Sequence, residues 1–262
     1  MTQSRRNLLA AASLLGVALW TRGARADKGG IPHNGGGNGK GGGNGGGHCF
    51  LRGTLIKTPV GEREISSLAI GDLVMTHSGQ VKPIKWIGRQ KFTRERGKRW
   101  NDEIAPIRVT RSALAEGLPH RDLYLSRWHA IYLDGLLITI GSLVNGSSIA
   151  ACNADEQLTL EYFHLELAGR DIVLAEDMPA ETLWVEDNDY SQFDNASERL
   201  TLGESTELPM RTIGPALNIT GGRRQLPSRI RSALAPLLDC RTDFDKIRDK
   251  IEDRAERVLA DA

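Results

Sequence analysis

The sequence predicts an all-β protein with a helical extension at its C-terminal end. Between residues 50 and 190, short segments recur in which apolar and polar residues alternate, as they do in half-buried strands. Turn signals separate these segments, and the clearest are Asp134-Gly135 and Asn145-Gly146. Helical periodicity is found only after about residue 195. Many short strands at this spacing indicate one β-rich domain, and 262 residues suffice to bury its core without disulfides.

The composition is that of an ordinary globular protein with balanced charge. Hydrophobic residues make up 40% and charged residues 26% of the chain. There are 34 Lys and Arg against 33 Asp and Glu, which leaves a net charge of +1. This balance gives no electrostatic reason to expect nucleic acid or an anionic membrane as a partner. We also expect no membrane span, no cofactor and no metal, because no segment has the corresponding pattern.

Residues 1–26 have the pattern of an export signal. Arg5-Arg6 precedes an uncharged apolar run, Leu8 to Trp20, and Ala24-Arg25-Ala26 is a cleavage site of the A-x-A type. The paired arginines resemble a twin-arginine signal of bacterial proteins, and the alternative is an ordinary secretory signal that carries two arginines. We expect the mature chain to begin at Asp27 and the protein to be exported, periplasmic or extracellular.

Residues 27–47 consist of little but Gly, Asn and Lys. Such a segment cannot bury enough apolar area to offset the entropy of ordering it, so we expect a flexible tail. It lacks the periodic Asp of calcium-binding Gly-rich repeats. No strand precedes it, and no Lys-Ser/Thr pair closes it as in a phosphate-binding loop. We therefore assign it neither a metal nor a phosphate.

The β-rich domain, residues 48–195, begins where this tail ends. Residues 53–58 alternate apolar and polar side chains, and residues 59–62 read as a turn. Ser78-Gly79 forms a hairpin turn before the next apolar run. The same signals give expected strands at 53–58, 73–76, 81–88, 104–109, 123–125, 130–133, 136–140, 158–167 and 172–174.

The C-terminal extension, residues 196–262, is expected to be partly helical. Residues 227–238 and 242–259 both have helical patterns. Thr242 is a candidate N-cap, with acidic residues in the first turn after it. The second helix packs on the β domain or, alternatively, binds a partner. Its apolar face consists of Phe244, Ile247, Ile251, Ala255 and Val258.

Three cysteines follow the signal. In an oxidising compartment an odd count leaves one thiol unpaired. A Cys152–Cys240 bridge with Cys49 free suits the chemistry described below, and the alternative is three unpaired cysteines. Cys49 lies where the polar tail meets the first strand, whereas a structural cysteine more often lies among apolar neighbours within a strand.

A thiol nucleophile needs a base, and His129 is the candidate base among six histidines. It follows an expected strand in the order Leu125-Ser126-Arg127-Trp128-His129, and another apolar run begins directly after it. An S-x-x-H turn between two strands can direct the Ser126 hydroxyl and the imidazole at one point. His164, by contrast, is expected to be a packed or surface residue of its strand.

In order and spacing, these residues resemble the Hedgehog/intein (Hint) domain family. Residues 49–56, followed by Gly61-Glu62, Gly71-Asp72 and Val74, are similar to its opening block. The S-R-W-H turn is similar to its T-x-x-H block, with Ser in place of Thr. Residues 162–167 and 172–176 resemble its closing strand pair, and the closest likeness is to bacterial Hint-type domains of exported proteins. The resemblance covers about residues 48–190 and implies a horseshoe-like β fold.

The resemblance also implies a chemistry. The Cys49 thiol attacks the carbonyl of His48 and turns the peptide into a thioester by an N-to-S acyl shift. His129 protonates the departing nitrogen, and the Ser126 hydroxyl binds the scissile amide or its tetrahedral intermediate. The substrate is then the protein's own Gly-rich segment, the acceptor is water or another nucleophile, and the protein is self-acting rather than a multiple-turnover enzyme.

One departure from the family limits which reaction products we expect. Splicing members end in a His-Asn pair, whereas this chain continues from Ala175-Glu176 into Asp177-Met178-Pro179. Splicing is therefore not expected, and cleavage or acyl transfer is. The alternatives are a catalytically silent Hint-fold binding or surface module and a hydrolase that uses Cys49 and His129 on an external substrate.

Overall fold

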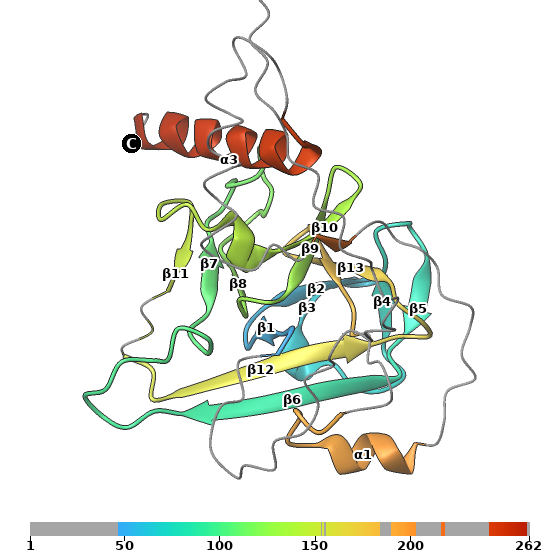
Figure 1. The fold of residues 1–262 in the computed structure, drawn as a ribbon. Coiled ribbons are helices and arrows are strands. Elements are labelled where there is room, and N and C mark those ends of the chain that lie inside the picture. Colours follow the sequence, from blue (N-terminus) through green and yellow to red (C-terminus); the bar gives the residue numbers. More distant parts are fainter. Residues whose placement is uncertain are drawn as a thin grey trace, which may run out of the picture. The chain divides into compact units, whose positions relative to one another are not determined.

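The computed structural model describes residues 47–152, 154, 156–183, 190–202, 216–217 and 241–260 (Figure 1). The predicted signal, nearly all of the Gly-rich tail, the predicted helix 227–238 and Cys240 lie outside these residues. The predicted boundaries between tail, β domain and extension therefore stay predictions. The described residues are β-rich with one long C-terminal helix, which confirms the predicted fold class.

Strands follow one another closely from residue 50 to residue 181. None of the helices in the described part of the chain is both long and apolar enough to cross a membrane. The strands are β1 (Phe50–Leu51), β2 (Leu55–Thr58), β3 (Gly61–Glu64), β4 (Leu73–Met75), β5 (Val81–Pro83), β6 (Trp86–Thr93), β7 (Ile107–Val109), β8 (Leu123–Leu125), β9 (Ala130–Leu133), β10 (Leu136–Thr139), β11 (Ile149–Ala151), β12 (Thr159–Glu166), β13 (Ile172–Ala175), β14 (Met178–Glu181) and β15 (Ala216–Leu217). The helices are α1 (Ala196–Thr201) and α3 (Asp243–Ala260).

Most of these strands lie where the alternation predicts them, and the differences have local causes. The run expected at 81–88 is two strands, because Pro83 lacks the N–H that would continue a ladder. Pro179 similarly weakens the strand signal of β14, which was not predicted. Nor were β1, β3, β11 and β15 predicted. Strand β3 overlaps the residues 59–62 that were read as a turn, and β15 pairs in parallel with β10 although it belongs to the extension.

Two larger sheets hold the fold together. One has the strand order β11-β7-β8-β1-β12-β6, the other the order β15-β10-β9-β14-β13-β2-β3, and β4 and β5 form a separate hairpin. In the first sheet, Phe50 pairs with Leu125 of β8 on one side and with Phe163 of β12 on the other. The short strand β1 therefore brings the residue before it next to the ends of two strands that are distant in sequence.

The open edge of β6 is covered by the segment 190–195. The side-chain oxygen of Asn195 accepts a hydrogen bond from the Arg89 N–H at 2.9 Å, and Asp194 N–H donates to the Arg89 carbonyl at 2.8 Å. Gly88 makes this approach possible, because a Cβ there would lie 2.5 Å from the Phe193 ring. A covered edge cannot recruit a strand from another chain.

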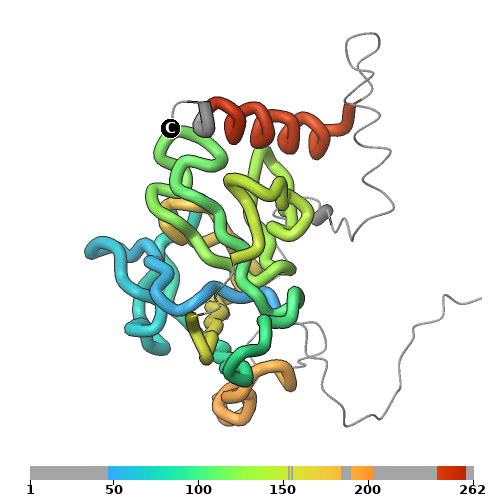
Figure 2. The backbone as a smooth tube through the Cα atoms, turned by 90° about the vertical axis from the view of Figure 1, so that its left-hand side faces the viewer, coloured from blue at the N-terminus to red at the C-terminus, as the bar shows by residue number. Residues whose placement is uncertain are grey.

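Helix α3 packs on the β domain, as its apolar face predicts. Phe244, Ile247 and Ile251 are buried in the main apolar cluster, which also contains Phe50. Thr242 caps the helix as predicted: Asp245 N–H donates to its hydroxyl at 3.2 Å, and Thr242 N–H donates to the Asp245 carboxylate at 2.8 Å. Figure 2 shows α3 in red, lying across the green loops at one end of the β domain.

Candidate active site

Cys49 lies directly before β1 and is completely buried. Its side chain belongs to a small apolar cluster that also contains Trp86 and Tyr162. Burial raises the pKa of the thiol well above its usual range, so the resting group is S–H rather than thiolate. The sulfur lies 3.9 Å from the side-chain oxygen of Gln90, which accepts the S–H.

Ser126 directly follows β8 and is bound to both sides of Cys49. Its hydroxyl accepts the Cys49 N–H at 2.8 Å, and its own N–H donates to the Cys49 carbonyl at 2.9 Å. The hydroxyl proton is donated to the carbonyl of Gly47. One buried hydroxyl thus joins the groups on the two sides of His48, and it fixes the orientation of the His48–Cys49 peptide bond.

The S-x-x-H turn brings His129 to the same place. Its N–H donates to the Ser126 carbonyl at 3.1 Å, which closes the turn. The imidazole is fully buried, and its ring centre lies 4.2 Å from that of Phe50. Neither ring nitrogen has a hydrogen-bond partner among the described residues. A buried polar group without a partner costs about 1–3 kcal/mol, and native proteins keep few of them.

Burial also sets the charge of His129. It lowers the pKa of the imidazole to about 3, and the neighbouring charge of His48 acts in the same direction. Backbone groups of Glu181, Cys49 and His48 oppose this shift, because they lie close to the ring. The ring is therefore neutral at neutral pH and lies beside the backbone of the bond that it would act on.

His164 on β12 belongs to this site as well. Its ring centre lies 5.0 Å from that of His129, and its Nε2 donates to the Glu181 carbonyl at 3.3 Å. Its Nδ1 has no partner among the described residues. Burial, and then His129, lower the pKa of His164 well below its usual value. The sequence predicted a packed or surface strand residue; the residue is packed, and it is packed against the candidate base.

Gln90 is the second residue that sequence reasoning missed. It lies on β6, where it is buried, and its amide donates to the carbonyl of Gln192. A polar residue that alternates inward within a strand was the available signal. This signal could be interpreted only once the strand pairing was known. Gln90 lies opposite Tyr162 of β12, and Tyr162 lies opposite Leu51 of β1.

His48 and the two other cysteines were also predicted as site residues, and Trp128 lies within the S-R-W-H turn. The His48 side chain is exposed while its carbonyl precedes the buried Cys49. The indole of Trp128 donates to Glu103 at 2.9 Å, and it is Phe50 and His164 whose rings contact the His129 imidazole. Cys152 is partly exposed, and its candidate partner Cys240 lies outside the described residues, so their pairing stays a prediction.

The arrangement suits acyl chemistry on the chain's own backbone. A thiol, a neutral imidazole and a hydroxyl surround one peptide bond. A substrate supplied from outside would have to reach a thiol with no exposed surface. Among the described residues, none of those around Cys49 belongs to a cluster whose side-chain atoms are close enough to hold a metal ion; Glu62, His120 and Glu176 form such a cluster elsewhere.

Comparison with known proteins gives one family and several distant structures. The sequence model described as "Hint domain" matches residues 48–187, more than half of the chain. The gp41-1 intein is 18% identical, with a TM-score of 0.35 over 52% of this chain and 98% of that one. A bacterial intein-like domain from Clostridium thermocellum is 16% identical, with a TM-score of 0.37 over 53% of this chain and 100% of that one. No curated protein matches at a significant level.

Proposed function

The chain belongs to the Hint domain family, a family of autoprocessing domains, and on this premise we propose that it cleaves its own His48–Cys49 bond. The observation that carries the proposal is the buried Ser126 hydroxyl, which accepts the Cys49 N–H at 2.8 Å and donates to the Gly47 carbonyl. These contacts orient a peptide bond that directly precedes a cysteine.

In the first step the Cys49 sulfur forms a bond to the carbonyl carbon of His48, and the carbon–nitrogen bond breaks. The thiol proton passes to His129, and His129 passes it to the departing Cys49 nitrogen. The products are a thioester and a free amine on the same residue, so atoms and charge balance without a co-reactant. Water or another nucleophile then attacks the thioester, the segment ending in His48 leaves, and the thiol is regenerated.

The neutral charge of His129 fixes the order of its two roles. An imidazole with a pKa of about 3 is not in the acidic imidazolium form at neutral pH. It therefore acts first as the base for the thiol, and only then as the acid for the amide nitrogen. The family resemblance implied only the second of these roles, that of the acid for the amide nitrogen.

The released fragment in this proposal is the Gly-rich segment that ends at His48. We propose export by the twin-arginine route, on the strength of Arg5-Arg6 and the A-x-A site, with cleavage after or during export. No new downstream nucleophile is required, because the outcome is hydrolysis or acyl transfer rather than splicing.

A catalytically silent Hint module is the second candidate. The burial of Cys49 favours it, because the resting thiol carries a raised pKa and is a poor nucleophile. Activity then requires His129 to remove the proton at the moment of attack. Measurement of the intact mass distinguishes the cleaving domain from the silent module.

The test is the intact mass of the purified chain, followed over time with and without hydroxylamine or dithiothreitol. Cleavage produces one discrete fragment that ends at His48. Cys49→Ala abolishes it, His129→Ala slows it by roughly 100- to 10,000-fold, and Cys152→Ala leaves it unchanged. An uncut but correctly folded chain in the presence of nucleophile supports the silent module. A Cys49→Ala variant that still loses its tail indicates an outside protease acting on a flexible segment.

A further inference from the structure

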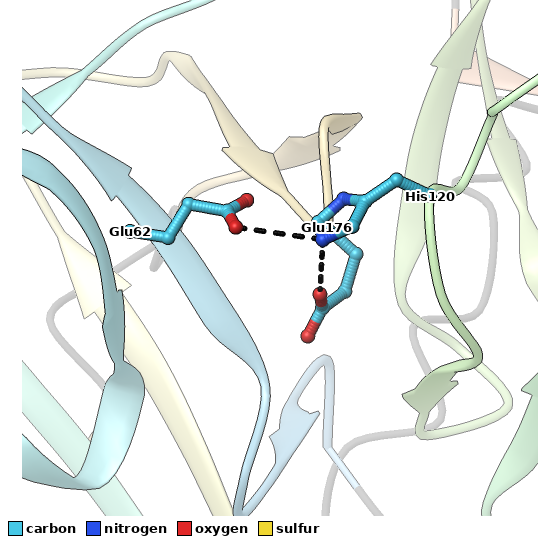
Figure 3. Close-up of side chains that lie close together, drawn as sticks. All are labelled: Glu62, His120 and Glu176. Carbon is cyan, nitrogen blue, oxygen red and sulfur yellow. Dashed lines mark ion pairs between the residues drawn. The ribbon is translucent and has the colours of Figure 1, made fainter.

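Three titratable side chains meet at a second point of the fold, outside the residues assigned to cleavage. Glu62 lies on β3, His120 in the loop before β8, and Glu176 in the turn after β13 (Figure 3). His120 Nε2 lies 3.4 Å from Glu62 Oε2 and 3.4 Å from Glu176 Oε2. The three potential ligand atoms all lie within 4.8 Å of one another.

The Glu176 carboxylate is the unusual member of this group. Only 1% of its side chain is exposed. Its Oε1 accepts the Leu55 N–H at 2.7 Å, whereas Oε2 makes no hydrogen bond within the described structure. Arg121 Nε lies 2.8 Å from Oε2 as an ion pair, and the same guanidinium donates to the carbonyl of Gly53. A carboxylate oxygen has two acceptor sites, so Oε2 keeps one of them directed at His120.

Asp177 completes the arrangement from the other side of the ring. Its Oδ2 lies 3.6 Å from His120 Nδ1, while the two glutamates face Nε2. A histidine that ligates a metal almost always directs its other ring nitrogen at a carboxylate, a carbonyl or water, which fixes the tautomer. Asp177 is placed for this role, with the lone pair of Nε2 left facing the glutamates.

The distances fit a small transition-metal ion. Zinc binds His nitrogen and carboxylate oxygen at about 2.0–2.2 Å, so neighbouring ligands in a tetrahedral site lie roughly 3.4 Å apart. This is the observed separation of His120 Nε2 from each glutamate oxygen. We propose that Glu62, His120 and Glu176 bind one zinc ion, with Asp177 orienting the imidazole and water in the fourth position. This site is independent of the proposed cleavage.

The ion would connect three segments that are far apart in sequence. Glu62, His120 and Glu176 come from the β2–β3 hairpin, the loop before β8 and the β13–β14 turn. Because the unfolded chain holds no such site, the free energy of zinc binding adds to the free energy of folding. The ion therefore acts as a structural cross-link.

Zinc titration by calorimetry tests this on the full chain in a Cys49→Ala background, which removes a competing thiol and prevents cleavage. The parent is expected to bind one equivalent of zinc. The His120→Gln and Glu62→Gln variants are expected to bind zinc at least 100-fold more weakly. Both positions are partly exposed, so these variants are expected to fold, which circular dichroism verifies. Asp177→Asn is expected to weaken binding roughly 10- to 100-fold.

His77→Gln is the matched control, because it removes another exposed histidine and is expected to leave the titration unchanged. Zinc also raises the melting temperature of the parent and of His77→Gln, but not that of His120→Gln. Absence of saturable binding in the parent overturns the proposal. So does a titration that is the same in His120→Gln as in the parent, because the zinc is then held by other residues.

Discussion

In the proposed cleavage, Ser126 acts through a single hydroxyl. Removing it in Ser126→Ala leaves the Cys49 N–H and the Gly47 carbonyl without their shared partner. We expect the rate of tail release to fall by roughly 100- to 1,000-fold, the usual cost of losing one oriented hydrogen-bonding group at a reacting centre. Intact-mass time courses measure this rate.

Two further variants make that measurement specific. Ser126→Thr keeps the hydroxyl and is expected to retain most of the rate. Ser142→Ala removes a hydroxyl that donates to the Thr139 carbonyl in another turn, and the rate should not change. If Ser126→Ala cleaves as fast as the parent, Ser126 is a structural residue of the turn.

The two buried histidines make stability depend on pH. The pKa of His129 is lowered from 6.5 to about 3 in the folded protein, and that of His164 is lowered in the same direction. The unfolded chain therefore takes up protons below pH 6.5 that the folded chain does not. The contribution of these histidines to the free energy of unfolding is therefore complete above pH 6.5. It falls as the pH decreases towards 3, by up to about 1.4 kcal/mol per pH unit for each histidine.

Urea unfolding of the Cys49→Ala chain at pH 7, 6 and 5 measures this dependence, above the range in which most carboxylates titrate. His164→Gln and His129→Gln should each flatten the slope, whereas His77→Gln, at an exposed position, should not. Equal slopes in the parent and in both buried-site variants would show that the histidines are not buried in the neutral form.

Among single residues, the sequence predicted those whose chemistry is visible locally. Cys49 at the tail boundary, and Ser126 and His129 in one short turn, were predicted and lie together. Gln90 and His164 were missed as site residues because each looks like an ordinary strand residue. Their proximity to Cys49 depends on β1 lying beside β12, and this pairing is not encoded in either local pattern.

At the scale of elements, α3 makes the clearest energetic prediction. Ile247 is buried between the helix and the β domain, so Ile247→Ala is expected to lower the free energy of unfolding by about 2–5 kcal/mol. Glu256→Ala, on the exposed face, is expected to change it by less than about 0.5 kcal/mol. Urea unfolding compares the two. An Ile247→Ala variant as stable as the parent would favour the alternative of a partner-binding helix.

Strand prediction succeeded where alternation was uninterrupted. It failed where proline, extreme shortness or a lack of apolar residues, as in β3, removed the signal. The strand expected at 158–167 is β12, Thr159–Glu166. The run at 81–88 broke at Pro83, and β14 was missed because Pro179 lies within it. A two-residue strand such as β15 has no periodicity to detect; it exists through its pairing with β10.

At the scale of the whole molecule, the candidate site is a product of sheet order. The strand β1 has two residues, yet it lies between β8 and β12 and so places Cys49 between the Ser126 turn and His164. Cys49 and Ser126 are 77 residues apart in the sequence. The composition and alternation predicted the fold class, whereas the strand order became apparent only in the structure.

The complete burial of Cys49 has a consequence for the lifetime of the protein. Oxidation to sulfenic acid and alkylation both require a thiolate that a reagent in solution can reach. This sulfur is protonated and inaccessible, so the nucleophile resists chemical damage for as long as the domain stays closed. In the proposed cleavage this protection costs no activity, because the substrate bond is already inside and a second molecule does not have to enter.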